Sequence, residues 1–263
     1  MNSLLLCYAA SLLVLLAGFF GILFFIQKGI KIKFHWGMFF LGIIIAVITA
    51  AVVVLLWRVT FRTDNYYNTV FFRTLVGFVY LGLLCFLRIL IVRNAAFANY
   101  HEEKGYSFCF GFGAAPGLLM GAYLLIMLPV VGFNGLFNGP CIVAEEGYLT
   151  FADNTIITVF RPAAGHISFA LAFLFFAVMA VGTGIILHNA THRLLRRGVS
   201  TVWTVFAIVI EAGAILPLPF FRMYGMQHWA LAVTEGVLAV VMILLAFLMP
   251  DVKEEVTYTK QFE

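Results

Sequence analysis

Among the ionisable side chains inside the long apolar stretches of this 263-residue chain, four are best placed to do chemistry. They are Arg88, His166, Glu211 and Glu235. A charge in the hydrocarbon of a bilayer costs at least ~2.5 kcal/mol, so such residues are retained for a function or for contacts inside a helical bundle. Both interpretations apply to each of the four.

Glu211 is the most informative of them because it lies in the middle of its apolar segment. A carboxyl group at that depth is either protonated or paired with a cation. It therefore indicates a proton, ion or metal site, or else a hydrogen bond to a neighbouring helix. His166 and Glu235 both belong to the outer half of the membrane, so they can meet, although either is also compatible with an interfacial position.

The composition indicates that these residues are surrounded by a lipid bilayer rather than by water. Hydrophobic residues make up 63% of the chain and charged residues 11%, against roughly 25% charged in an ordinary soluble domain. A membrane span needs roughly 20 apolar residues, and only helices or closed barrels satisfy their backbone in lipid. We therefore predict an all-α membrane protein, a bundle of about seven transmembrane helices at residues 4–26, 36–57, 69–92, 108–131, 163–187, 199–216 and 228–249.

Lysine and arginine set the expected orientation. Alternate gaps between the segments hold ten of these residues against five in the intervening gaps. The positive-inside rule then places the N-terminus outside and the C-terminus in the cytoplasm. We expect residues 1–250 to form one transmembrane domain, residues 251–263 a short cytoplasmic tail, and the protein to be multi-pass in a bacterial plasma membrane. The net charge of +4 reflects this topology, so nucleic acid is not an expected partner.

The longest gap, residues 132–162, lies on the outer side. Asn and Gly pairs in it are typical of turns, and residues 149–151 and 155–160 have the composition of strands. We predict a capped loop with a short strand pair or a re-entrant piece. The four cysteines have no spacing for disulfide pairing or metal binding, so we expect free thiols.

Several features occur in a familiar order. A lysine-rich turn follows the first segment, Gly111-Phe-Gly113 opens the fourth, Arg161 precedes His166, and Trp229 precedes Glu235. In these respects the chain resembles the YhfC family of intramembrane metalloproteases, distant relatives of the CAAX-protease group. The resemblance implies a site in which a glutamate activates water and histidines bind metal or the oxyanion.

The chain departs from that family where the chemistry is done. Arg88 matches the arginine of the family's Glu-Glu-x-x-Arg, but Leu84 and Cys85 stand in place of the glutamates, and Ala114 stands in place of a histidine. Without the acid pair no general base lies within reach of water at that depth. We therefore expect a non-proteolytic membrane subunit that binds a transmembrane helix or peptide in the lipid bilayer.

Two alternatives stay open. An intramembrane peptidase could have rebuilt its centre from His166, Glu211 and Glu235, with zinc as its metal, or it could use Glu102 and Glu103 as the acid pair. A proton-coupled transporter could use Glu211 as its relay. Enzymatic activity and cofactor are therefore unassigned by the sequence.

Overall fold

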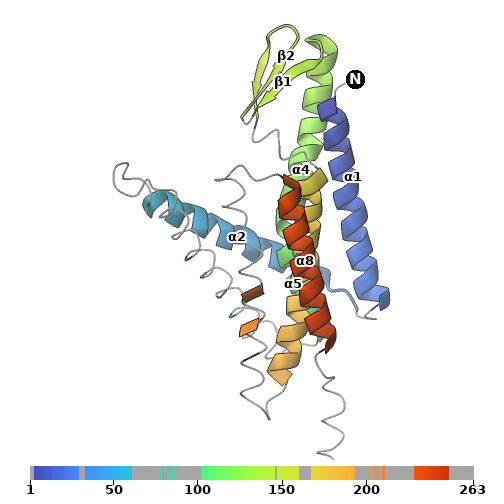
Figure 1. Cartoon of the computed structure of the whole chain (residues 1–263), viewed down its shortest axis with the longest axis vertical. Coiled ribbons are helices and arrows are strands. Elements are labelled where there is room, and N and C mark those ends of the chain that lie inside the picture. The colour runs from blue at the N-terminus through green and yellow to red at the C-terminus, as the bar shows by residue number, and fades with distance from the viewer. Residues whose placement is uncertain are drawn as a thin grey trace, which may run out of the picture.

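The computed structural model describes residues 3–29, 33–60, 102–145, 147–159, 167–192 and 228–248, with isolated helical positions at 79, 83, 86, 90, 202, 205, 206, 209 and 210. Within them, four helices are long and apolar enough to cross a membrane, and Figure 1 shows their arrangement. These are α1 (Ser3–Phe24, continued by the π-helix Phe25–Gly29), α4 (Glu102–Phe137), α5 (Ile167–His192) and α8 (His228–Leu248). A further helix, α2 (Trp36–Thr60), is apolar over the part whose side chains are described without a gap, Trp36–Val52. The predicted helical membrane architecture is thus confirmed in its coarse form.

Five of the seven predicted segments coincide with α1, α2, α4, α5 and α8. The predicted segments 69–92 and 199–216 lie outside the described residues, apart from isolated helical positions. The predicted end of the fourth segment was wrong. We expected the helix to end at residue 131, whereas α4 continues to Phe137. The asparagines that suggested a turn instead support the helix, since Asn134 donates to the carbonyl oxygen of Val130 and Asn138 donates to the Asn134 side chain.

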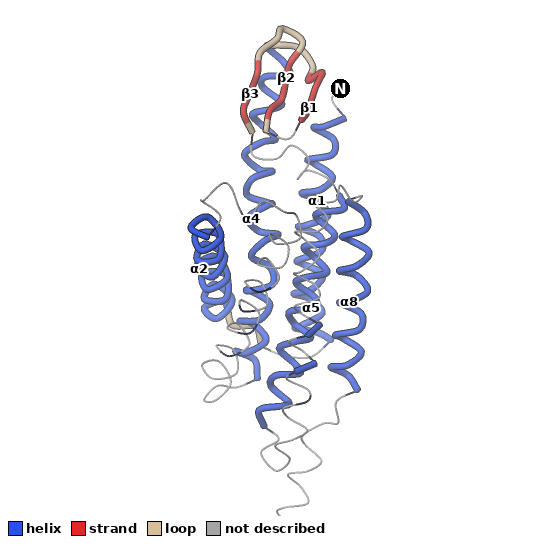
Figure 2. Tube along the Cα trace, turned by 60° about the vertical axis from the view of Figure 1, so that its left-hand side comes forward, coloured by secondary structure: helices blue, strands red, loops and turns tan. Residues whose placement is uncertain are grey.

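The helices run in two directions along one long axis (Figures 1 and 2). α1, α5 and α8 run away from the end that carries the N-terminus and the strands, and α4 runs toward it. Lys28 and Lys33 follow α1 and Lys104 begins α4, so these three cations lie at the end opposite the strands. Lys28, Lys33 and Lys104 therefore gather at one end of the bundle.

α4 is the central helix, and glycine allows each neighbour to approach it. A Cβ at Gly113 would collide with Ala180 of α5, and one at Gly117 would lie 2.6 Å from the ring of Phe19 in α1. Two small residues of α4, four positions apart, thus serve two different helices. Close backbone approach through small residues is the usual way membrane helices associate.

α2 contacts α4 more closely still, and then turns away from the other helices (Figures 1 and 2). A Cβ at Gly42 would collide with the carbonyl oxygen of Phe108, and a Cβ at Gly111 with that of Phe39. The Phe39 and Phe110 rings pack at 5.3 Å between centroids. We call the Gly42–Gly111 contact, with these two rings, the α2–α4 crossing.

A three-stranded antiparallel sheet lies against the first turns of α1 and the last turns of α4, at the end of the bundle that carries the N-terminus. It consists of β1 (Cys141–Glu145), β2 (Tyr148–Phe151) and β3 (Ile156–Thr158). Its fixed register pairs Glu145 with Tyr148 and Leu149 with Ile157. The predicted strand at 149–151 is confirmed by β2, and the one predicted at 155–160 is confirmed over Ile156–Thr158, whereas β1 was not predicted.

Alternation along β2 anchors the sheet to the helices. Leu149 and Phe151 are fully buried against the α1–α4 end, whereas Tyr148 points outward and is exposed. Gly147 has φ of +108°, a conformation that favours glycine, and it joins β1 to β2. The sheet is therefore packed onto the bundle by one face only.

Candidate functional site

Small side chains dominate the contact between α5 and α8. On α8, successive buried residues are separated by seven, three and four positions. They are Ala232, Ala239, Met242 and Ala246. That spacing places them on one helix face. They pack against Ala172, Met179 and Ile186 of α5, and we call this set the α5–α8 seam.

Glu235 occupies the middle of that buried face. It follows Ala232 by three residues and precedes Ala239 by four, and it is only 3% exposed. Its Oε2 atom has no hydrogen-bond partner among the residues described. Buried polar groups are nearly always paired, so an unpaired one requires an explanation.

The described apolar segments of the neighbouring helices carry no charged side chain that could pair with Glu235. The sequence has no Asp, Glu, Lys, Arg or His in residues 3–26 of α1, 105–137 of α4 or 167–186 of α5. Thr183 on α5 and Thr234 on α8 are polar, but each donates its hydroxyl to a backbone carbonyl of its own helix. Within these described segments, Glu235 is the one carboxyl group in an otherwise apolar bundle.

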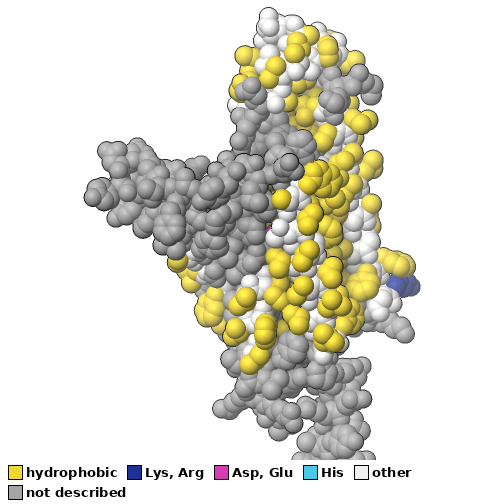
Figure 3. Space-filling view, in the orientation of Figure 1, with side chains coloured by type: hydrophobic (Ala, Val, Ile, Leu, Met, Phe, Trp, Pro, Cys, Tyr) yellow, Lys and Arg dark blue, Asp and Glu magenta, His cyan; other side chains and the backbone are white. Residues whose placement is uncertain are grey.

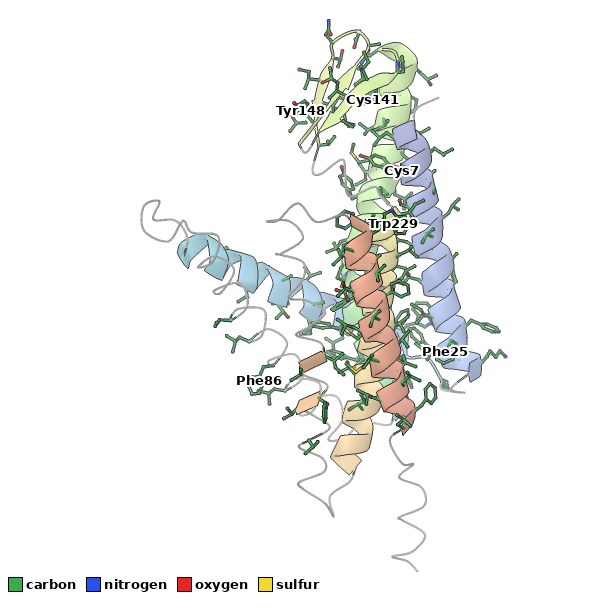
Figure 4. All side chains as sticks on the ribbon, viewed as in Figure 1. Cys7, Phe25, Phe86, Cys141, Tyr148 and Trp229 are labelled. Atoms are coloured by element: carbon green, nitrogen blue, oxygen red, sulfur yellow. The ribbon has the colours of Figure 1, made fainter. Side chains whose placement is uncertain are left out.

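A shallow groove of about 450 Å³ runs beside the seam, between α5 and α8. Every lining residue is apolar or glycine, including Leu171 and Phe175 of α5 and Trp229, Ala232, Gly236 and Val237 of α8. Figure 3 shows that the described surface over α8 lacks basic atoms, and Figure 4 shows Trp229 at the outer end of that helix. The lining of the groove therefore favours a largely apolar partner surface.

The other predicted site residues, Arg88, His166 and Glu211, lie outside the described residues. Ile210, the residue before Glu211, is described and packs against the Met179–Met242 part of the seam. Within the described part of the chain, no group of three His, Cys, Asp or Glu side chains could hold a metal ion. Of the predicted set, the structure therefore places Glu235 alone.

The buried phenols Tyr8 of α1 and Tyr123 of α4 were missed by the sequence analysis. Their hydroxyl groups lie near each other beneath the sheet, and Tyr8 is fully buried. The Tyr123 hydroxyl has no hydrogen-bond partner of normal geometry among described residues. A tyrosine within an apolar segment is usually interfacial, so only the helix contact reveals their proximity.

Two titratable groups of the sheet have environments that change their acidity. Partial burial raises the pKa of the Cys141 thiol, which keeps it protonated and unreactive. Hydrogen bonds from the Thr155 hydroxyl and backbone N–H lower the pKa of the exposed Asp153 carboxyl. Cys7, Cys109 and Cys141 are free thiols, as predicted for them; Cys85 lies outside the described residues.

Comparison with protein-family models, with curated protein sequences and with solved structures found no match.

Proposed function

We propose that this protein is a multi-pass subunit of the bacterial plasma membrane that binds a transmembrane helix or peptide without cleaving it. The groove between α5 and α8 carries the proposal, because it is apolar throughout, elongated along two helices and open to the side. In lipid, helices associate through close van der Waals packing rather than through the hydrophobic effect. A surface of this shape is what such packing requires.

The floor of the groove has the residues that favour helix packing. Ala232 and Gly236 are four residues apart and form a small-xxx-small pair, and Val233, Val237 and Val240 border it. The valines are 58–63% exposed, so a neighbouring helix could cover them. β-branched side chains lose little rotamer freedom in a helix contact because few rotamers are open to them.

The surroundings of Ala114 in α4 support the proposal that the protein does not cleave its partner. Ala114, which stands where the resembled protease family has a histidine, is 1% exposed. It belongs to a buried cluster with Phe39, Phe110, Ala177 and Val181, none of which can ligate a metal, and Tyr106, which carries a hydroxyl group, belongs to the same cluster. A non-proteolytic relative of the YhfC family fits these surroundings better than an active enzyme.

Reconstitution with a fluorescent polyleucine helix tests the proposal. Energy transfer from the labelled protein to the helix in liposomes should be saturable, and Val237→Trp, which fills the groove, should remove it. Leu13→Trp on the exposed face of α1 is the matched control, because Leu13 is 67% exposed but lies far from the groove in sequence and on another helix. Equal energy transfer in both variants would refute helix binding at the groove.

The proposed topology has seven spans with the N-terminus outside. It is supported by the position of Lys28, Lys33 and Lys104 at the end opposite the N-terminus. Cysteine-reactive probes that cannot cross the membrane should label Asn154→Cys in intact cells, in a Cys-free background, and should not label Lys28→Cys. Labelling of both from the same side would overturn the orientation.

Proton-coupled transport is a second candidate, and the observation that favours it is the buried Glu235 carboxyl group, whose Oε2 atom has no partner among the described residues. Carboxyl groups buried in membrane bundles serve as proton relays in pumps and transporters. Proteoliposomes carrying a pH-sensitive dye would then show proton flux under a potential, and Glu235→Gln would abolish it. Absence of flux would leave the helix-binding function as the sole proposal.

A further inference from the structure

We propose that Glu235 pairs with a basic residue carried by the transmembrane helix that occupies the α5–α8 groove. This inference rests on the proposed function and specifies the chemistry of the partner. It assigns the one carboxyl group of the described apolar bundle to recognition rather than to catalysis.

The need for a partner follows from the surroundings of Glu235. The side chain is 3% exposed, and its Oε2 atom has no partner among described residues. The apolar parts of α1, α4 and α5 carry no positive charge. Carboxyl groups within membranes pair with cations or with hydrogen-bond donors, and a helix entering from lipid can bring either.

The groove reaches the backbone on both sides of Glu235. Ala232, one turn earlier, and Gly236, the next residue, both line it. Because Gly236 has no side chain, the ring of Phe175 covers this point, and a Cβ at Gly236 would lie 3.2 Å from its Cε2 atom. Glu235 itself is buried and does not line the groove, so its side chain must change rotamer, past the Phe175 ring, to meet a helix that occupies the groove.

Charge complementarity identifies the partner. The groove is otherwise wholly apolar, so it cannot distinguish one apolar helix from another except by shape. A lysine or arginine at the depth of Glu235 would neutralise both charges, and it would be rejected if no acid were present. Glu235 follows Trp229 by six residues, which places it roughly 9 Å deeper along the helix.

Three synthetic helices in liposomes test this. One is polyleucine, one carries a single lysine roughly 9 Å below its outer end, and one carries the lysine in the opposite half. Wild-type protein should bind the matched lysine helix about tenfold more tightly than polyleucine, as expected for one interhelical polar contact. Glu235→Gln, which keeps the shape, should remove that preference, and Glu235→Asp should retain part of it.

Thr234→Val is the matched control, since the Thr234 hydroxyl bonds to Ala230 of its own helix. It should leave the lysine preference unchanged. If all three helices bind equally, or the preference survives in Glu235→Gln, the inference is wrong and helix binding stands. If no helix binds to the wild type, the proposed function itself fails.

Discussion

The α2–α4 crossing and the α5–α8 seam are both built from small residues, yet they leave different possibilities for function. At the crossing, Gly42 and Gly111 bring backbone against backbone, and aromatic rings close the surrounding space. At the seam, Gly182 faces the flexible side chain of Met242, and a carboxyl group lies among the alanines. The crossing is a rigid contact, whereas the seam can adjust.

This difference indicates where a membrane bundle can hold chemistry. A contact between backbones leaves no room for a polar side chain or for movement, because interiors are close-packed. A contact of alanine, glycine and methionine can admit both, because methionine has three rotatable bonds and adapts to irregular space. We therefore assign the structural role to the α2–α4 crossing and the functional role to the α5–α8 seam.

The largest expected effect is at the crossing. Gly111→Leu should destabilise the protein by about 3 kcal/mol or more, because a side chain there meets the Phe39 backbone, which cannot yield. Thermal unfolding in detergent measures this. Gly37→Leu in α2 is the control, since a Cβ at Gly37 meets nothing within 4 Å. A similar loss in both variants would show that α2 does not cross α4 as described.

The next effect has the opposite sign. Glu235→Leu should stabilise the isolated protein by about 1–3 kcal/mol, because it removes a buried polar group that lacks a partner. Glu235→Gln should stay within about 1 kcal/mol of the wild type. Denaturation in mixed micelles distinguishes the two. Strong destabilisation by Glu235→Leu would mean that a residue of the same chain already pairs with Glu235.

A smaller effect should distinguish the two glycine contacts. A Cβ at Gly182 would lie 2.8 Å from Cγ of Met242, whose side chain can move aside. Gly182→Ala should therefore stay within about 1 kcal/mol of the wild type, helped by the higher helix propensity of alanine. The same thermal unfolding assay measures this, with Gly111→Ala for comparison. Equal losses would mean that the seam is as rigid as the crossing.

The smallest effect lies outside both contacts, in the turn between β2 and β3. The folded pKa of Asp153 is below its usual value, so its stabilising contribution is present above the unfolded pKa and is lost as pH falls through the folded pKa. Hydrogen exchange of the Thr155 amide should accelerate relative to neighbouring amides on acidification. In Asp153→Asn this acid-dependent change should disappear. Loss of helix protection over the same pH range would contradict a purely local role.

The length and the composition of the apolar segments were enough to predict the apolar helices, because a bilayer imposes both on any helix that crosses it. They were not enough to place the end of α4. Asn134 and Asn138 are read as turn residues, but within a helix their side chains bond one turn back and replace backbone partners. The preference of asparagine for turns was outweighed by these side-chain hydrogen bonds at the end of α4.

The sequence could identify single residues of the candidate site, but not their arrangement. Glu235 is conspicuous in the sequence because acids are rare in apolar segments. Its isolation in the seam depends on which face of α8 meets α5, and the very even apolarity of these helices conceals that face. The proximity of Tyr8 to Tyr123 has the same origin, since it depends on the antiparallel pairing of α1 with α4.

Site-specific cross-linking tests helix binding at the groove most directly. A single cysteine at Val237, in a chain whose native cysteines are replaced, should cross-link to a cysteine-bearing polyleucine helix in liposomes. A cysteine at Leu13, equally apolar and 67% exposed on α1, should not cross-link above background. Equal cross-linking at both positions would show that the groove is ordinary lipid-facing surface, and it would contradict the helix-binding function.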